Sequence, residues 1–251
     1  MRRRARLLIA FLLPVATATA CAGDEPDGTV LTVLAAASLS SSFEELAERF
    51  EDTHDGVTVE LGLAGSSDLA AQVISGAPAD VLATADLATM ERVAAEGLTG
   101  SEPQVFATNT LQLVVPPDDP GDVSSLADLA DEDLAVVVCA PEVPCGGAAR
   151  SLAEAAGVTL AADSEEQSVA DVLGKVRTGE ADAGLVYVTD VVAAAGDVIG
   201  IDVPEATSVV NDYPVATLDG SDQEVLAQEF VDLVLSDEGR QVLAEAGFGP
   251  P

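Results

Sequence analysis

Apolar positions along the chain follow two alternating patterns. Short runs that are wholly or alternately apolar predict strands, and stretches with apolar residues three or four positions apart predict helices. The strand-like runs cover residues 30–37, 57–63, 80–84, 111–115, 134–138, 183–188 and 208–217. The helix-like stretches lie between them, at 41–50, 67–75, 87–96, 147–156, 168–178 and 222–235. Strands that alternate with helices predict an α/β fold with right-handed crossovers and a mostly parallel sheet.

Local signals support the ends of several of these helices. Ser41, with Glu44 three residues later, fits a capping box at the start of the first helix. Ser67 or Asp68 is placed to cap the second helix. Glycines at 76 and 157 fit the left-handed position that commonly follows a helix C-terminus.

The N-terminus has the form of a secretory signal. Four of the first six residues are arginine, and the apolar run that follows is short and interrupted by Pro14. Small residues then lead to Cys21 in a sequence that resembles a bacterial lipobox. We therefore expect a signal peptide at residues 1–20, lipidation of Cys21 and a polar tether at 21–28. The alternative is ordinary signal cleavage, which leaves Cys21 as a free thiol.

Charge limits the classes of partner. Aspartate and glutamate number 44 against 10 lysines and arginines, and the formal net charge is −34. Four of those ten basic residues also lie in the predicted signal peptide. Such a surface repels nucleic acid and anionic lipid headgroups. We expect no nucleic-acid partner, and membrane contact only through the lipid anchor.

Two of the predicted strands end in serine-rich turns that precede helices. Ser38 follows the first strand, and Ser66 follows the second. In open α/β sheets, ligands bind beyond the carboxyl ends of the strands, where helix N-termini present free N–H groups. A hydroxyl beside such groups favours a negatively charged ligand. Either serine could instead serve only as a helix N-cap.

A third strand end carries the pair Cys139 and Cys145 around a turn held by Pro141 and Pro144. The amides at Cys145 and the following residues open the next helix and form another terminus suited to an anion. In an exported protein these two cysteines are expected to form a disulfide, and two free buried thiols are the alternative. The spacing is not C-x-x-C and no histidine is nearby, so a redox or metal site is not favoured.

The ordered motifs resemble one known family. "AAASL", "GSSDLAAQV", "GAPADVLATAD", "PEVPCG", "GLVYVTD" and "YPVA" are together similar to the molybdate-binding proteins of bacterial ABC transporters, over about residues 29–249. This resemblance implies a two-lobed periplasmic-binding-protein fold of type II, with an oxyanion in the cleft between the lobes. It implies a first lobe of 29–108 plus 216–251 and a second lobe of 109–215.

The same resemblance implies how the anion is held. The hydroxyls of Ser38, Ser66 and Tyr187 and the backbone amides of Cys145 and Val169 match the family's ligand positions. No side chain would coordinate a metal directly, and no cofactor is implied. The loop before Cys145 is one residue shorter than the family's usual form, with cysteine where alanine is usual. Without the resemblance, Tyr187 would be read as a core strand residue.

The function that the resemblance implies is capture and delivery. An exported, lipid-anchored monomer on the extracytoplasmic face of the membrane would bind molybdate or tungstate. It would then pass the anion to an ABC permease and its ATPase subunits. Both anions are fully deprotonated near neutral pH, so their oxygens only accept hydrogen bonds and suit a site made of donors.

Two alternative functions follow from the residues. One is a binding protein for another tetrahedral oxyanion, such as sulfate or phosphate. The other, which is disfavoured, is a serine hydrolase, because a nucleophilic serine normally needs a histidine base. The single histidine, His54, lies in the polar turn that ends the first predicted helix, and there is no G-x-S-x-G motif. We therefore expect that the protein is not an enzyme.

Overall fold

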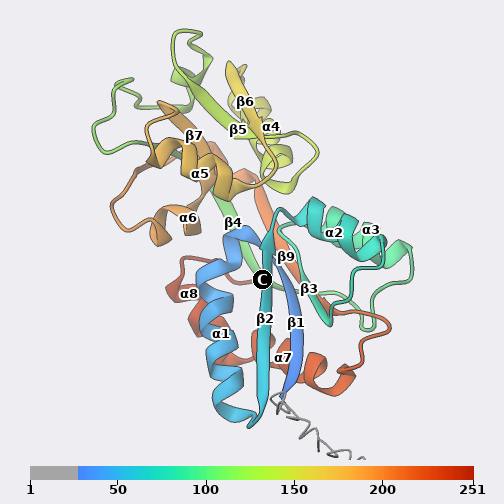
Figure 1. Ribbon diagram of the computed structural model, residues 1–251. Coiled ribbons are helices and arrows are strands. Elements are labelled where there is room, and N and C mark those ends of the chain that lie inside the picture. The colour runs from blue at the N-terminus through green and yellow to red at the C-terminus, as the bar shows by residue number, and fades with distance from the viewer. Residues whose placement is uncertain (1–27) are drawn as a thin grey trace, which may run out of the picture.

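The computed structural model describes residues 28–251, which form two lobes joined by a pair of long strands (Figure 1). The predicted signal peptide, the lipidation site Cys21 and all but the last residue of the predicted tether lie outside the described residues. Nine strands form one curled sheet that runs through both lobes, in the order β2-β1-β3-β9-β4-β7-β5-β6, with β8 beside β4. The predicted α/β class is confirmed.

The first lobe contains parallel strands connected by helices. Its elements are β1 (Thr29–Ala36), η1 (Ala37–Leu39), α1 (Ser40–Thr53), β2 (Val57–Ala64), α2 (Ser66–Ile74), β3 (Val81–Ala83), α3 (Leu87–Ala95), α7 (Glu224–Leu235) and α8 (Asp237–Glu245). β1 pairs in parallel with both β2 and β3. Side chains of β1 alternate between the two sheet faces, as expected for a pleated strand. Val33 packs with residues of α1, α7 and α8, whereas Leu34 packs with residues of α2 and α3.

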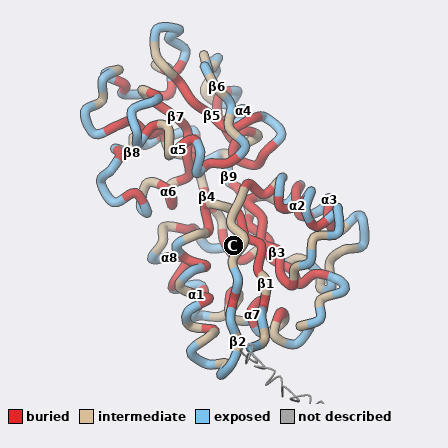
Figure 2. Tube along the Cα trace, in the orientation of Figure 1, coloured by how far each residue is buried: buried red, intermediate tan, exposed pale blue. Residues whose placement is uncertain are grey.

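The second lobe repeats this arrangement around its own core. Its elements are η2 (Leu126–Ala130), β5 (Val136–Cys139), α4 (Pro144–Ala156), β6 (Ala162–Glu166), α5 (Val169–Arg177), β7 (Ala183–Tyr187), α6 (Val188–Ala193), β8 (Ile199–Ile201) and η3 (Pro204–Ser208). β5 pairs in parallel with β6 and β7. The buried cluster of this lobe runs from Leu111 to Ala206 and is separate from the clusters of the first lobe (Figure 2).

Two strands carry the chain between the lobes. β4 (Gln104–Val115) and β9 (Val210–Thr217) pair antiparallel, with Asn109 opposite Asn211. β9 continues antiparallel onto β3, and β4 continues antiparallel onto β7. The sheet is therefore parallel towards both ends and antiparallel in the middle, because the two connecting strands pass between the lobes in opposite directions. The residue boundaries expected for the lobes stay a prediction.

Some sequence predictions at the element ends are wrong. The N-cap of α1 is Leu39 and that of α2 is Gly65, and neither helix has a side-chain cap, so the expected caps at Ser41 and at Ser67 or Asp68 do not form. The C-terminal glycines are confirmed, with positive φ angles of 68° at Gly157 and 87° at Gly76.

Several elements are also absent from the sequence prediction. They include α8, α6 and the edge strand β6, whose sequence "ADSEE" is partly exposed and contains no apolar alternation. β4 begins seven residues earlier than predicted, because its first half pairs with β9 in the connection between the lobes.

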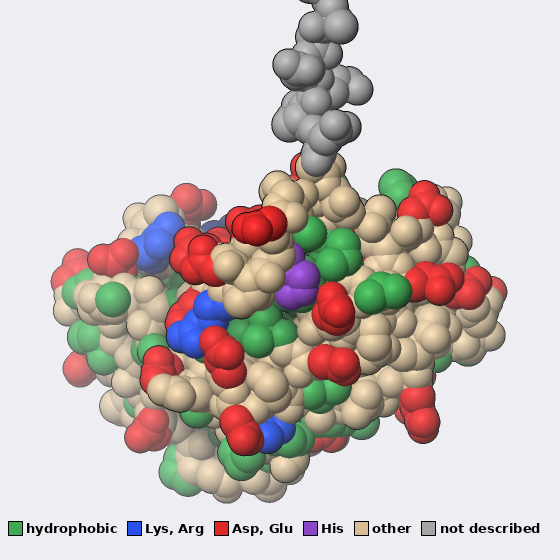
Figure 3. All heavy atoms as spheres, turned by 90° about the horizontal axis from the view of Figure 1, so that it is seen from below, with side chains coloured by type: hydrophobic (Ala, Val, Ile, Leu, Met, Phe, Trp, Pro, Cys, Tyr) green, Lys and Arg blue, Asp and Glu red, His purple; other side chains and the backbone are tan. Residues whose placement is uncertain are grey.

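The surface carries many scattered carboxylates. Figure 3 shows one face on which acidic side chains are spread widely and basic ones are few. Within residues 28–251, no helix combines the length and the apolar character that crossing a bilayer would require.

Candidate functional site

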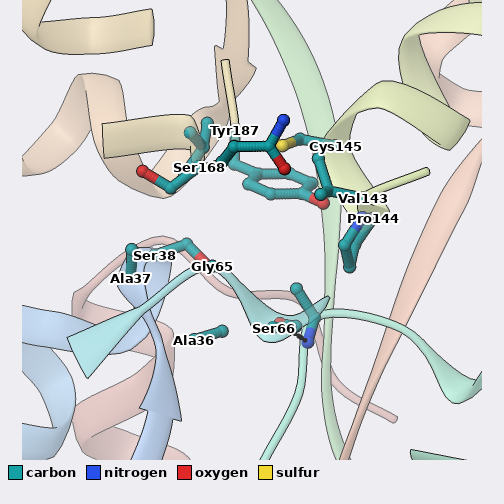
Figure 4. Close-up of a pocket in the computed structure, with 13 residues that line it drawn as sticks. Ala36, Ala37, Ser38, Gly65, Ser66, Val143, Pro144, Cys145, Ser168 and Tyr187 are labelled. Atoms are coloured by element: carbon teal, nitrogen blue, oxygen red, sulfur yellow. Dashed lines mark hydrogen bonds between the residues drawn. The ribbon is translucent and has the colours of Figure 1, made fainter. Parts of the chain in front are cut away.

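A small pocket lies between the lobes, and all five sequence-predicted ligand residues line it (Figure 4). The first lobe contributes residues 36–38, 65, 66 and 85, and the second contributes 143–145, 167–169 and 187. The cavity has a volume of about 20 Å³. A cavity of this size is suited to one small ligand and not to a peptide or a sugar chain.

Helix N-termini converge on this pocket from both lobes. α2 begins at Ser66, α4 begins at Pro144 with Cys145 as its second residue, and α5 begins at Val169. The N–H groups in the first turn of a helix have no intrahelical acceptor, and the helix dipole places partial positive charge there. No lysine, arginine, aspartate or glutamate lines the pocket among the described residues. The arrangement therefore attracts an anion through neutral donors.

The two serines of the strand-end turns are buried, and neither caps a helix. Ser38 lies in η1 with its Oγ 2.9 Å from the Oη of Tyr213, and it is 7% exposed. Ser66 is 2% exposed, and its Oγ accepts a hydrogen bond from the N–H of Ala85 at 3.0 Å. The capping alternative for these serines is thus wrong, and both residues line the pocket.

Tyr187 ends β7 and is at once a core residue and a pocket residue. It is 1% exposed, and its Oη accepts a hydrogen bond from the Nδ2 of Asn211 at 3.1 Å. Burial raises the pKa of this phenol well above its usual value, with the charges of neighbouring acidic groups acting in the same direction. The hydroxyl consequently keeps its proton and can donate it to a ligand.

The loop that carries Cys145 is fixed by covalent and steric constraints. Cys139, at the end of β5, and Cys145, in the first turn of α4, form a disulfide. The chain turns so tightly between them that a Cβ atom on Gly146 would come within 1.8 Å of the carbonyl oxygen of Ala140. Only glycine fits such an approach without a shift of the backbone. The amide of Cys145 is thereby held at the pocket.

Comparison with known proteins identifies the family. The family of bacterial extracellular solute-binding proteins matches residues 31–249. The chain belongs to this family. A curated relative from Mycobacterium tuberculosis strain H37Rv, the molybdate-binding protein ModA, is 46% identical over 234 residues, which cover 93% of this chain and 90% of the relative.

Solved structures share the fold of this solute-binding protein. The periplasmic molybdate-binding protein of Azotobacter vinelandii aligns with a TM-score of 0.76 at 20% identity, covering 88% of this chain and 99% of that one. The sulfate-binding protein SubI of M. tuberculosis aligns with a TM-score of 0.74 at 17% identity, covering 88% and 87%. The two-lobed periplasmic-binding-protein fold implied by the sequence motifs is confirmed.

The lobes of the solute-binding protein contact one another at two places beside the pocket. Ser67, the second residue of α2, donates its hydroxyl to the carbonyl oxygen of Glu142 at 3.1 Å. Gly65 lies so close to Gln167 that a Cβ atom on the glycine would be 2.3 Å from the glutamine carbonyl oxygen. The described structure is thus a closed arrangement of the two lobes.

Sequence reasoning missed several residues at the site. Ser168 lines the pocket and caps α5, with its Oγ 3.2 Å from the N–H of Asp171. Its S-x-x-D spacing is typical of a capping box and indicates the start of a helix at this position. Asn211 and Tyr213 lie behind the pocket on β9 and contact Tyr187 and Ser38. These two contacts join residues 24 and 175 positions apart, so no local pattern could reveal them.

His54 takes no part in the site. It ends α1, where its ring stacks on Phe50 with centroids 3.9 Å apart and its Nε2 lies 3.2 Å from Glu229. Ser38 lies just before the other end of this 14-residue helix, which is about 20 Å long. No serine–histidine pair forms between them. A solute-binding protein holds and releases its solute without covalent chemistry, so the chain is not an enzyme and needs no cofactor.

Proposed function

We propose that this solute-binding protein captures molybdate, and also tungstate, outside the cytoplasm and delivers it to an ABC permease. The observation that carries the proposal is the 46% identity to a curated molybdate-binding protein over 93% of the chain. The uncharged pocket between the lobes supports it independently. Molybdate offers oxygens that only accept hydrogen bonds, and the pocket presents hydroxyls and helix N-termini that can donate them.

In this proposal five residues hold the anion. The hydroxyls of Ser38, Ser66 and Tyr187 and the backbone N–H groups of Cys145 and Val169 donate to its oxygens. Backbone amides at helix N-termini bind anions without a counter-cation. The cysteine in place of the family's usual alanine does not remove the proposed donor, because that donor is the main-chain N–H of Cys145 and not its side chain.

Delivery depends on movement of the lobes. The lobes at 29–108 plus 216–251 and at 109–215 close on the ligand by a hinge within β4 and β9, near 108–111 and 211–215. The closed form is what the permease recognises. The protein acts as a monomer, and the lipid on Cys21 holds it at the extracytoplasmic face of the membrane. The acidic surface opposes approach of an anion, so capture is expected to be slow at low salt.

Calorimetric titration tests the assigned ligand. The chain without its predicted signal peptide is titrated with molybdate, tungstate, sulfate and phosphate in parallel. We expect tight one-to-one binding of molybdate and tungstate and no binding of the other two. Binding of sulfate or phosphate alone would overturn the assigned ligand and leave the fold and family unchanged.

Sulfate is the second candidate. The fold similarity to a sulfate-binding protein, at a TM-score of 0.74, favours it over phosphate. Both sulfate and molybdate are tetrahedral and present four acceptor oxygens, so only the size of the closed cavity can separate them. The same titration therefore decides between the two ligands.

A further inference from the structure

Asn211 lies directly behind the pocket and contacts two of its walls. It sits on β9 where the strands cross between the lobes, and it is 7% exposed. Its Nδ2 donates to the carbonyl oxygen of Ala85 at 2.9 Å and to the Oη of Tyr187 at 3.1 Å. Asn211 does not itself line the pocket.

The contact with Ala85 decides the orientation of the Asn211 amide. A backbone carbonyl oxygen can only accept hydrogen bonds, so the side-chain atom that faces it must be the NH₂ group. The same NH₂ group then supplies its second proton to Tyr187, whose oxygen must act as the acceptor. The proton of the Tyr187 hydroxyl is therefore not used in the bond with Asn211.

The peptide unit at Ala85 extends this arrangement to Ser66. Its carbonyl oxygen accepts from Asn211, while its N–H donates to the Oγ of Ser66 at 3.0 Å. The Oγ of Ser66 is thus also an acceptor, and the proton of its hydroxyl is not used in the bond with Ala85. Hydrogen bonds that follow one another in a chain polarise and strengthen each other in a buried setting.

We infer that Asn211 is a positioning residue that sets the hydroxyls of Tyr187 and Ser66 as donors and so makes the pocket selective for fully deprotonated oxyanions. The inference rests on the proposed function. A protonated oxyanion such as hydrogen phosphate needs an acceptor for its own proton. The oxygens of Tyr187 and Ser66 each already accept one hydrogen bond, from Asn211 and from the N–H of Ala85, and no carboxylate lines the pocket among the described residues.

Asn211→Asp tests the inference with little change of shape. An ionised carboxylate cannot donate to Ala85, and it accepts a hydrogen bond from the Tyr187 hydroxyl, which then no longer donates to the ligand. Molybdate affinity should therefore fall about 100-fold at pH 8.5. When the pH is lowered to 5.5, the buried carboxyl gains a proton. The molybdate affinity of the variant should then rise by about tenfold relative to its value at pH 8.5. The parent chain, titrated at each pH, accounts for Asp86 and Asp190, whose charges also act on Tyr187.

Asn109→Asp is the matched control. Asn109 pairs with Asn211 across the two strands, is 4% exposed, and donates its Nδ2 to Thr189 at 2.9 Å and not to a pocket hydroxyl. We expect it to lose less than about tenfold in affinity, with no recovery at low pH. An identical pH profile for both variants would mean that any buried charge at the crossing suffices, and would overturn the inference.

A second variant covers the case in which Asn211→Asp does not fold. Asn211→Leu is made in the parent chain and in a Tyr187→Phe chain. If Asn211 acts through the hydroxyl, its replacement costs much less affinity when that hydroxyl is already absent. Equal losses in both chains would overturn the inference. If the parent chain itself did not bind molybdate, the proposed function would be wrong. This outcome differs from equal losses in both chains, which would overturn only the role of Asn211.

Discussion

Gly65 of the first lobe lies against the carbonyl oxygen of Gln167 of the second lobe, where a Cβ atom would come within 2.3 Å. The backbone of Gly65 has φ −59° and ψ 135°, a conformation open to any residue. The glycine is therefore required by the closeness of the two lobes and not by the turn. This contact distinguishes the closed arrangement of the lobes from an open one.

Gly65→Ala should consequently prevent full closure without unfolding either lobe. We expect molybdate affinity to fall at least about tenfold while the thermal midpoint without ligand changes by less than about 3 °C. Small-angle scattering with ligand should show a smaller decrease in radius than in the parent chain. A variant that closes and binds like the parent would show that the lobes tolerate the extra methyl group.

The two serine hydroxyls should each matter for binding more than for stability. Ser38→Ala and Ser66→Ala each remove one donor to the proposed anion, and each is expected to weaken binding about tenfold to 100-fold. Ser42→Ala is the matched control, because Ser42 is 1% exposed but donates to Leu39 within the same turn and does not line the pocket. Calorimetry on all three variants checks this. Equal effects at Ser42 would contradict a specific role for the pocket serines.

Removal of the disulfide should act on stability first. A Cys139→Ala, Cys145→Ala chain loses a cross-link that closes a short loop, with an expected cost of about 2 kcal/mol in the free energy of unfolding. Binding should fall less than in the serine variants, because the main-chain N–H at position 145 remains. Chemical denaturation and calorimetry of parent and variant measure the two effects. Affinity lost with no loss of stability would indicate that the sulfur atoms themselves shape the pocket.

Asp190 should make stability depend on pH. Burial raises the pKa of its carboxyl from 3.8 to about 7, against the opposing hydrogen bond from the N–H of Tyr187. Between these values the folded chain holds a proton that the unfolded chain releases, so this group lowers the free energy of unfolding as pH rises from about 4 to 7. Above pH 7 the full penalty of the buried charge is present.

Asp190→Asn removes this titration and keeps an oxygen that can accept from Tyr187. The variant should be more stable than the parent at pH 8 and should lose that advantage by pH 4. Urea denaturation of both chains across this range gives the difference directly, since the other carboxyl groups are common to both. A difference that stays constant with pH would show that Asp190 is ionised in the folded chain throughout.

Much of the fold could be predicted from local patterns. Most of the predicted strands and helices are present within a few residues of their expected ends, because apolar periodicity reflects which face of each element is buried. The failures have local physical reasons. The edge strand β6 forms through its pairing with β5 and not through apolar side chains. The helix α2 has no side-chain cap because its N-cap residue is Gly65, which has no side chain.

The sequence by itself determined the α/β class, the turns that carry Ser38, Ser66 and Cys145, and, through the order of motifs, the family. Only the tertiary structure decided that these turns meet in one pocket, because they belong to different lobes that are brought together by the crossing of β4 and β9. It also decided the orientation of Asn211, since an amide is fixed by the partners around it and Ala85 and Tyr187 are distant in the chain. Local preference selects elements, whereas the direction of each donor depends on contacts that exist only in the folded chain.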